Sequence, residues 1–258
     1  MPNKRWRVLA TRPQAQNAQW SEVLQKAGYS VLAIPMLAIE AVLDEANKTR
    51  IKQQILNFDH YQHIIFVSQN AVEHCSYWLQ DYWPQLPAKM SYFAVGDKTA
   101  EQVRQLLCAS DVNGGALAMN TEAMLLLPEL QALSGVKVLI CRGRGGRTTL
   151  GDELAARGAL LEYCELYQRS LPAQASEQLA VNDIKPATDV LVVFSGETLK
   201  NTLCAASGCG KLAEILSLPC VVPGNRVAEL AKAQGFSRIH IAENASQDCM
   251  LNYLDREF

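Results

Sequence analysis

A complete strand, loop, helix, strand pattern occupies residues 137–169. A short apolar run, 138–141, ends in the basic glycine loop 142–147, and a helical pattern begins at Thr148. Gly158 ends this helical pattern, and a second extended run follows it. Two strands joined by a crossover helix are the unit from which parallel sheets are built, so this stretch predicts an α/β arrangement.

The loop 142–147 predicts a site for an anion. It contains three arginines and three glycines and leads directly into a helix. Glycines let backbone N–H groups approach a ligand closely, while the helix N-terminus and the guanidinium groups attract negative charge. The loop has no Gly-Lys-Ser/Thr sequence, and Thr148 stands where a dinucleotide motif needs its third glycine. Phosphate or carboxylate binding and a solvated turn between strand and helix are equally good interpretations of this loop alone.

Length and charge limit the classes of function. With 258 residues, the chain is long for one core and suits two domains. A net charge of −2 gives no general reason to expect nucleic acid or an acidic membrane surface, so any anion site must be local. The sequence shows no signal peptide and no apolar stretch of the ~20 residues that a membrane span needs, which predicts a cytoplasmic protein.

Neither the cysteines nor the histidines form a metal-binding pattern. The eight cysteines are scattered without a CxxC pair, so we expect reduced core residues and neither disulfides nor a metal site. Two of the four histidines, His60 and His63, are three residues apart, but only Asp59 accompanies them as a further ligand. Partly buried structural histidines are therefore expected.

Strand-like apolar runs alternate with helical patterns along the whole chain, which predicts an α/β protein with parallel sheets. The expected strands cover residues 6–10, 30–34, 64–67, 92–95, 138–141, 160–167, 190–194, 219–222 and 238–242.

The chain also contains three pairs of similar segments. The strand from residue 7 corresponds to the strand from residue 137, segment 66–72 to segment 193–199, and segment 92–103 to segment 220–231. This repeat predicts two related α/β lobes. In each segment, polar residues stand between the carboxyl end of a strand and a helix, where open α/β sheets bind ligands.

Together these motifs resemble the uroporphyrinogen-III synthase family over essentially the whole chain. Seven short motifs occur in the order and at the spacing of that family, which is hard to obtain by chance. They are Val8 to Pro13, Phe66 to Val72, Ala94 to Gly96 with Thr99 and Ala100, Arg142 to Arg147, Tyr167 to Arg169, Phe194 to Gly196, and Arg226 to Ala228 before Gly235 and Phe236.

The resemblance implies two flavodoxin-like lobes with parallel sheets, joined by a two-stranded linker, with a ligand cleft between the lobes. The first lobe would be discontinuous and hold residues 1–36 and 171–258, whereas the second would hold residues 41–166. Residues 37–40 and 167–170 would form the two linkers and run antiparallel.

The activity that the resemblance implies is the cyclisation of hydroxymethylbilane, a linear tetrapyrrole with many carboxylates, to uroporphyrinogen III in haem biosynthesis. The terminal pyrrole ring is inverted and water is lost, through an azafulvene and a spiro intermediate. Such a lyase needs neither a cofactor nor a metal. It would act as a monomer and receive its substrate in a transient hand-over from hydroxymethylbilane synthase.

Positioning is the main task that the resemblance implies, because the substrate closes without the enzyme and then gives the isomer with an unflipped ring. Backbone N–H groups at helix starts, together with arginines, would bind the substrate carboxylates. The expected substrate-binding residues are Thr11, Arg12, Ser68, Asn70, Ala71, Gly96, Lys98, Thr99, Arg142, Gly143, Arg147, Ser195, Gly196, Gly224, Arg226 and Val227.

Tyr167 is the expected catalytic acid that helps the hydroxide leave. A phenol keeps its proton at neutral pH, and the resemblance implies that Tyr167 lies where a linker borders the cleft. A strand tyrosine packed at a domain edge is the alternative, which the residue by itself favours.

The chain departs from the family at two motifs. Relatives often carry Gly-Pro-Thr-Thr-Ala where this chain has Gly-Asn-Arg-Val-Ala at 224–228, so a hydroxyl contact is lost and Arg226 adds a charge. Ser195 and Gly196 lack the asparagine that is present at Asn70.

Two other classes of function stay open from the residues alone. A two-lobed binding protein for a small anion would have the same cleft, and only measured turnover separates it from the enzyme. A glycosyltransferase or other nucleotide-dependent enzyme could use the loop 142–147 for phosphate, but it would normally also require a metal or a carboxylate cluster, and no convincing cluster is found.

Overall fold

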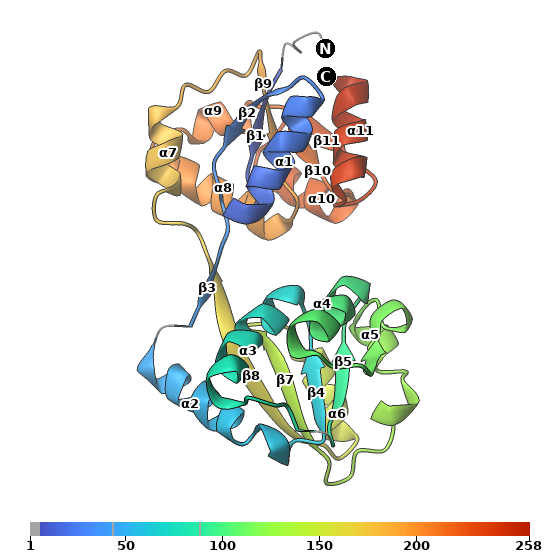
Figure 1. Cartoon of the computed structure of the whole chain (residues 1–258). Coiled ribbons are helices and arrows are strands. Elements are labelled where there is room, and N and C mark those ends of the chain that lie inside the picture. The colour runs from blue at the N-terminus through green and yellow to red at the C-terminus, as the bar shows by residue number, and fades with distance from the viewer. Residues whose placement is uncertain (1–5, 43, 88) are drawn as a thin grey trace. The chain divides into compact units, whose positions relative to one another are not determined.

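The computed structural model describes residues 6–42, 44–87 and 89–258, and the chain divides into two compact units (Figure 1). Unit 1 comprises Met1–Ala38 and Ser170–Phe258, and unit 2 comprises Ile39–Arg169. Within the described ranges, no helix combines the length and the apolar character needed to cross a membrane.

Unit 1 is built on a five-stranded sheet with the strand order β11-β10-β9-β1-β2. Neighbouring strands pair in parallel. Read from β2, this order corresponds to the 2-1-3-4-5 order of flavodoxin-like sheets. The strands are β1 (Arg7–Ala10), β2 (Ser30–Ala33), β9 (Asp189–Val192), β10 (Cys220–Val222) and β11 (Ile239–Ile241).

Helices cover both faces of the unit 1 sheet, which explains why its central strands are apolar without alternation. On one face, Trp20 and Met250 share an apolar cluster with Val190, and on the other face Leu191 packs in a second cluster with Leu203. The first face carries α1 (Gln14–Lys26) and α11 (Gln247–Glu257). The second carries α7 (Ala175–Val181), α8 (Gly196–Gly208), α9 (Leu212–Leu216) and α10 (Asn225–Ala233).

Unit 2 is built on a six-stranded sheet with the order β3-β8-β7-β4-β5-β6. The pairings from β8 to β6 are parallel. The strands are β3 (Ala38–Ala41), β4 (His63–Phe66), β5 (Ser91–Ala94), β6 (Val112–Gly114), β7 (Lys137–Gly143) and β8 (Leu160–Ser170).

The unit 2 sheet is likewise covered on both faces. Ile64 and Leu139 pack in one apolar cluster with Ile55 and Val72, whereas Ile65 packs in another with Leu154. The first face carries α2 (Glu45–Leu56), α3 (Gln69–Tyr82) and α4 (Asp97–Leu107), and the second carries α5 (Thr121–Met124) and α6 (Thr149–Ala156). The 3₁₀ turns are η1 (Phe58–His60), η2 (Gly115–Leu117) and η3 (Pro128–Leu130).

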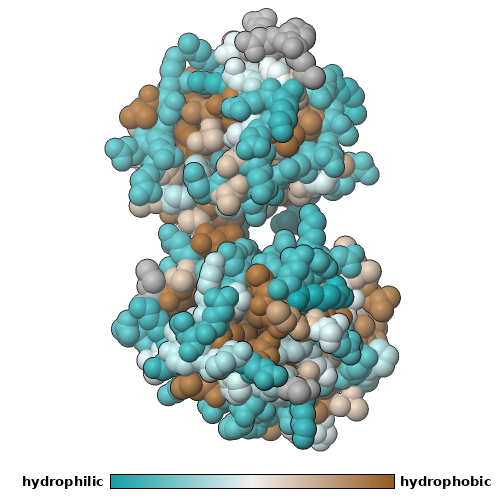
Figure 2. Space-filling model, in the orientation of Figure 1, coloured by the Kyte–Doolittle hydropathy of each residue, from teal (hydrophilic) through white to brown (hydrophobic). Residues whose placement is uncertain are grey.

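The outward surfaces are mainly polar. Figure 2 shows hydrophilic residues over most of the visible face of each unit, with smaller apolar patches between them. Leu117, Met119 and Leu126, which stand around η2 and α5, are large apolar side chains that remain exposed.

The predicted α/β fold with parallel sheets is confirmed. The three repeated segments also occupy equivalent places, because the order β2-β1-β9-β10-β11 of unit 1 corresponds to β8-β7-β4-β5-β6 of unit 2. In each sheet the first repeat therefore stands beside the second, and the second beside the third.

One detail differs from the sequence-based prediction. The strand β6 was not expected, because Val112–Gly114 is short and ends in Asn-Gly, a typical turn sequence. Residues 37–40 and 167–170, which were expected to form a two-stranded linker, lie largely in β3 and at the end of β8, and these two strands are neighbours in one sheet.

Candidate functional site

Each sheet has one point at which the chain changes the direction in which it adds strands. Open α/β sheets bind ligands at the carboxyl ends of the strands beside this point. In unit 2 it lies between β4 and β7, which are followed by Ser68 and by the loop from Gly143 to Arg147. In unit 1 it lies between β9 and β1, which are followed by Ser195 and by Thr11. All of these positions belong to motifs singled out in the sequence.

In unit 2, Ser68 links the start of α3 to Tyr167 of β8. The Ser68 Oγ accepts a hydrogen bond from the backbone N–H of Ala71 at 3.2 Å and so caps the helix. The same oxygen lies 3.0 Å from the Tyr167 hydroxyl oxygen. Ser68 is half-buried, whereas Tyr167 is only 1% exposed. The expected acid is therefore an interior side chain whose hydroxyl contacts Ser68.

The Tyr167 ring is enclosed by its neighbours. A bulge between Arg142 and Gly143 places Gly143 opposite Tyr167, and an ideal Cβ on Gly143 would lie 2.6 Å from a ring carbon. The His74 ring of α3 stacks on the Tyr167 ring, with the ring centroids 5.5 Å apart and an angle of 21° between the planes. The Arg144 backbone N–H donates to the Tyr167 carbonyl at 2.7 Å. These contacts hold the ring in one position.

Burial lowers the pKa of His74, while the neighbouring Glu73 partly opposes this effect. The imidazole is therefore neutral at neutral pH and stacks on Tyr167 as an uncharged ring. His74 contributes to the enclosure of Tyr167, a role that the sequence did not reveal. The sequence holds no signal for this contact, because His74 stands six residues after Ser68 and does not share its helical face.

Arg142, an expected substrate-binding residue, is turned inward and is only 6% exposed. Its Nη2 donates to the Glu165 carboxylate at 3.1 Å and its Nη1 to the Arg147 carbonyl at 3.1 Å. The guanidinium also lies 4.2 Å from the centroid of the Tyr163 ring. Arg142 thus supports the glycine loop from within, and its charge is balanced by Glu165 of the neighbouring strand. The sequence did not identify Glu165 as a partner.

The other two loop arginines face outward. Arg144 forms an ion pair with Asp44, the residue that caps α2. This hydrogen bond is the main cause that lowers the pKa of Asp44 to about 2. Arg147 is exposed. Arg144 and Arg147 are therefore the two loop arginines at the surface, and Asp44 pairs with the first of them.

A second helix start in unit 2 follows β5. Gly96 precedes α4 with a φ of +81°, which a glycine adopts without strain, and an added Cβ would meet nothing within 4 Å. Lys98 is exposed and Thr99 is buried, and both belong to the first turn of α4. Asn70 and Ala71 occupy the corresponding first turn of α3. The Ala71 N–H donates to Ser68 and the Thr99 N–H to the Gly96 carbonyl, so the N–H groups that precede them in each first turn are the ones left to face this edge of the sheet.

In unit 1, Thr11 and Arg12 follow β1. The buried Thr11 hydroxyl donates to the Val192 carbonyl at 2.8 Å and so ties the ends of β1 and β9 together. The Arg12 guanidinium lies 4.2 Å from the Phe194 ring centroid, and burial lowers its pKa. Its Nη1 is buried without a hydrogen-bond partner among the described residues, although Nε and Nη2 both donate to Gln16. The positively charged guanidinium of Arg12 thus lies at this edge of the sheet, and one of its N–H donors is not used.

Ser195 caps α8 as Ser68 caps α3, because the Thr198 backbone N–H donates to its Oγ at 3.1 Å. The Ser195 hydroxyl pairs with the Thr198 hydroxyl at 2.9 Å. An ideal Cβ on Gly196 would lie 2.8 Å from Leu230 and 4.0 Å from Nη1 of Arg226. Arg226, which is exposed in the first turn of α10, therefore reaches the start of α8.

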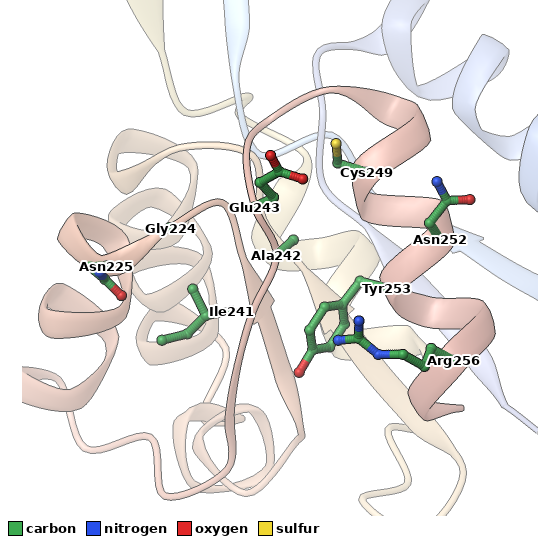
Figure 3. A pocket seen from close by; sticks show the side chains of 9 residues that line it. All are labelled: Gly224, Asn225, Ile241, Ala242, Glu243, Cys249, Asn252, Tyr253 and Arg256. Carbon is green, nitrogen blue, oxygen red and sulfur yellow. The ribbon is translucent and has the colours of Figure 1, made fainter.

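A pocket of about 560 Å³ lies in unit 1 beside the start of α10 (Figure 3). Gly224, which precedes α10 with a φ of +100°, is the expected binding residue that lines it, whereas Val227 is buried in the helix. Figure 3 shows Glu243 from the segment between β11 and α11, and Asn252 from α11, among the polar side chains of the lining. The sequence motifs did not predict this pocket.

Within the described ranges, no group of three or more metal-ligating side chains is found. His63 packs against Phe93, and His240 packs against Tyr253 and Phe258. His63 and His240 are thus partly buried, as was expected of the histidines, whereas the expectation is wrong for His60, which is exposed.

Comparison with known proteins identifies relatives that are similar to this chain over almost its whole length. The family model described as uroporphyrinogen-III synthase HemD matches residues 18–252. The uroporphyrinogen-III synthase of Salmonella typhimurium is 30% identical over 247 residues, which cover 96% of this chain and 99% of the relative. That of Escherichia coli K12 is 29% identical over 255 residues, with coverage of 96% and 99%.

Solved structures show the same fold at lower sequence identity. A crystal structure of a mutant uroporphyrinogen III synthase from Thermus thermophilus has a TM-score of 0.64 and 17% identity, and it covers 97% of this chain and 98% of its own. The enzyme from Helicobacter pylori has a TM-score of 0.60 and 19% identity, with coverage of 98% and 99%.

Proposed function

Because the chain belongs to the uroporphyrinogen-III synthase family, we propose that it converts hydroxymethylbilane to uroporphyrinogen III in haem biosynthesis. The reaction inverts the terminal pyrrole ring, closes the macrocycle and releases water, so the enzyme is a cyclising lyase. The observation that carries the proposal is the family match over residues 18–252. The Ser68 and Tyr167 hydroxyl pair supports it, because it lies where the unit 2 sheet is expected to bind a ligand.

The enzyme's main contribution is the conformation in which the substrate reacts. Hydroxymethylbilane closes by itself to the isomer with an unflipped ring, so a catalyst must favour attack by the substituted position of the terminal ring. Holding the reacting atoms in one geometry can lower the activation free energy by about 7–11 kcal/mol in well-oriented systems. Such a catalyst needs many contacts to the periphery of the substrate and few reactive groups.

Helix starts supply contacts suited to the substrate carboxylates. In unit 2 these are the first turns of α3, with Asn70 and Ala71, and of α4, with Lys98 and Thr99. The N–H groups at the very start of each helix, before Ala71 and Thr99, and the positive end of the helix dipole both favour a carboxylate there. The proposed binding positions in unit 2 also include Gly96, Gly143 and Arg147.

Unit 1 offers the same kind of contact at the starts of α8 and α10. Gly196 and Gly224 begin these helices, and Arg12 and Arg226 add full positive charges near them. A guanidinium binds a carboxylate more strongly than a neutral donor does. Arg226 stands where relatives often carry threonine, so a charged contact replaces a hydroxyl contact in this chain.

The proton that the departing hydroxide requires comes from the Ser68 and Tyr167 pair. The Tyr167 hydroxyl contacts Ser68 at the carboxyl edge of the sheet, and the residue lies beside Gly143. Arg142 takes no direct part, because its Nη1 and Nη2 donate to the Arg147 carbonyl and to Glu165, and its Nε is buried. It maintains the loop on which Gly143 and Arg147 lie.

The proposal extends to the setting of the reaction. The enzyme acts in the cytoplasm as a monomer and receives hydroxymethylbilane from hydroxymethylbilane synthase in a transient hand-over. The eight cysteines are all free thiols, which is typical of a reducing compartment. A substrate that closes spontaneously to the wrong isomer favours a short transfer between the two enzymes.

The decisive test incubates the purified protein with freshly generated hydroxymethylbilane. The products are oxidised, and uroporphyrins I and III are separated by chromatography. We expect a switch from isomer I in the blank to isomer III with the protein. Isomer I alone, from protein shown by circular dichroism to be folded, would overturn the proposed function.

A further inference from the structure

The Tyr167 hydroxyl is poorly placed to contact a tetrapyrrole directly. The residue is 1% exposed, its ring is covered by Gly143 and His74, and its hydroxyl meets the Ser68 hydroxyl. The hydroxymethyl group of the substrate is carried by a large, highly charged molecule that cannot enter such a space. A residue nearer the surface must therefore mediate any proton transfer from Tyr167.

The hydrogen bonds of Ser68 allow an arrangement in which its own proton is not used within the protein. A serine hydroxyl has one proton and two acceptor lone pairs. The Ala71 N–H uses one lone pair, and the Tyr167 hydroxyl can use the other as a donor. In that arrangement the Ser68 proton remains available to an acceptor beyond the protein, and the half-buried position of Ser68 permits the contact.

We propose that Ser68 is the catalytic residue that donates a proton to the departing hydroxyl group, and that Tyr167 acts behind it by replacing that proton. This inference rests on the proposed function. The positive end of the α3 dipole lies at Ser68 and stabilises the negative charge that develops on both oxygens during the transfer.

The proton transfers balance over one turnover. The bond between the hydroxymethyl carbon and oxygen breaks, the electron pair leaves with the oxygen, and the Ser68 proton converts that oxygen to water. The Tyr167 proton moves to Ser68 Oγ at the same time. When the final carbon–carbon bond has formed and the pyrrole ring regains its aromaticity, the proton that it releases returns through Ser68 to Tyr167.

Unit 1 shows that a capping serine does not by itself create this pair. Ser195 caps α8 with the same geometry, but its hydroxyl bonds to Thr198 of its own helix. The combination of a capping serine with a buried tyrosine hydroxyl is therefore a feature of the Ser68 position and not a consequence of helix capping.

The test compares Ser68→Ala, Ser68→Thr, Tyr167→Phe and the double variant in the isomer assay. We expect Ser68→Ala to slow formation of isomer III by about 100-fold or more, as loss of a general acid does. Ser68→Thr keeps the hydroxyl and should retain most of the rate. Tyr167→Phe should lose less than Ser68→Ala, and the double variant should be no slower than Ser68→Ala because the two residues act in series.

Two further measurements separate the chemical role of Ser68 from its capping role. Ser246→Ala removes the matched cap of α11, where Ser246 accepts from the Cys249 N–H at 3.2 Å, and it should leave turnover unchanged. The turnover rate can also be plotted against the deuterium fraction in mixtures of H₂O and D₂O. The plot should be curved for the wild type, because two protons move, and linear for Tyr167→Phe.

The proposal is overturned if Ser68→Ala turns over at least as fast as Tyr167→Phe, or if the two losses multiply in the double variant. Either outcome would show that Tyr167 acts without Ser68. These results require the wild type to form isomer III, so failure of the proposed function, in which the wild type gives isomer I alone, is recognised separately.

Discussion

Gly143 and Tyr167 lie opposite each other on β7 and β8, so close that a methyl group on Gly143 would overlap the tyrosine ring. The bulge after Arg142 brings the two residues into register, and the ideal Cβ position on Gly143 is 2.6 Å from one ring carbon and 3.1 Å from the hydroxyl oxygen. Glycine at this position therefore determines where the Tyr167 hydroxyl lies relative to Ser68.

Gly143→Ala should displace the Tyr167 ring and lengthen its contact with Ser68. We expect an overpacking cost of about 1–3 kcal/mol in the free energy of unfolding. Turnover should fall about as far as in Tyr167→Phe, with isomer III still the product. Gly146→Ala is the matched control, because its nearest contact would be 3.4 Å. Unchanged turnover in Gly143→Ala would show that the ring position does not matter.

Tyr167→Phe should slow turnover without abolishing it. The chemistry is largely intrinsic to the substrate, and Ser68 retains its own proton when the phenol is removed. Single-turnover rates and isomer ratios measure the effect. A rate equal to the uncatalysed background would assign Tyr167 a larger role than proposed, and an unchanged rate would remove it from the reaction.

Arg142 and Arg147 should differ in what their removal affects. Arg142→Ala leaves Glu165 with only its longer ion pair, to Arg50 at 3.4 Å, and removing one member of a buried ion pair costs about 3–5 kcal/mol. We expect the lower end of that range, because the Glu165 side chain is 19% exposed. Arg147→Ala should change the free energy of unfolding by less than about 0.5 kcal/mol and raise KM. Urea unfolding and steady-state kinetics on both variants distinguish these effects, and an equal loss of stability would contradict the assignment.

The ion pair between Asp44 and Arg144 should make stability depend on pH in the acid range. The pKa of the Asp44 carboxyl group is about 2 in the folded chain, against an ordinary value of 3.8 in the unfolded chain. Between these values the unfolded chain binds more protons, so the stabilisation is complete above pH 3.8 and is lost as pH falls through about 2. Urea unfolding of wild type and Asp44→Asn should therefore differ at pH 7 and converge towards pH 2. Arg144→Gln should reproduce the Asp44→Asn profile, and a constant difference at all pH values would refute this origin.

The local elements followed from the sequence because their signals are local. The apolar runs 64–67 and 138–141 predicted β4 and β7, and the polar residues after each run predicted a ligand edge. The three repeated segments also indicated two similar units. The identity of the family came from resemblance, since the same residues taken singly left an anion-binding protein and a nucleotide-dependent enzyme open.

Side-chain orientation after a fully apolar run could not be predicted. Arg142 follows four buried residues, and a strand buried on both faces has no alternation that distinguishes an inward from an outward position. Only the pairing of β7 with β8 shows that Glu165 lies beside it. The short strand β6 was likewise missed, because its place beside β5 depends on pairing and not on its own residues.

The sequence by itself thus determined which segments form strands and helices and where polar residues stand along them, because periodicity and capping act within a few residues. The tertiary structure alone decided that Ser68 and Tyr167, which are 99 residues apart, share a hydrogen bond. That contact requires the order β8-β7-β4 and a glycine on the strand between them. Strand order results from packing helices on both faces of the sheet, which no short segment of the chain encodes.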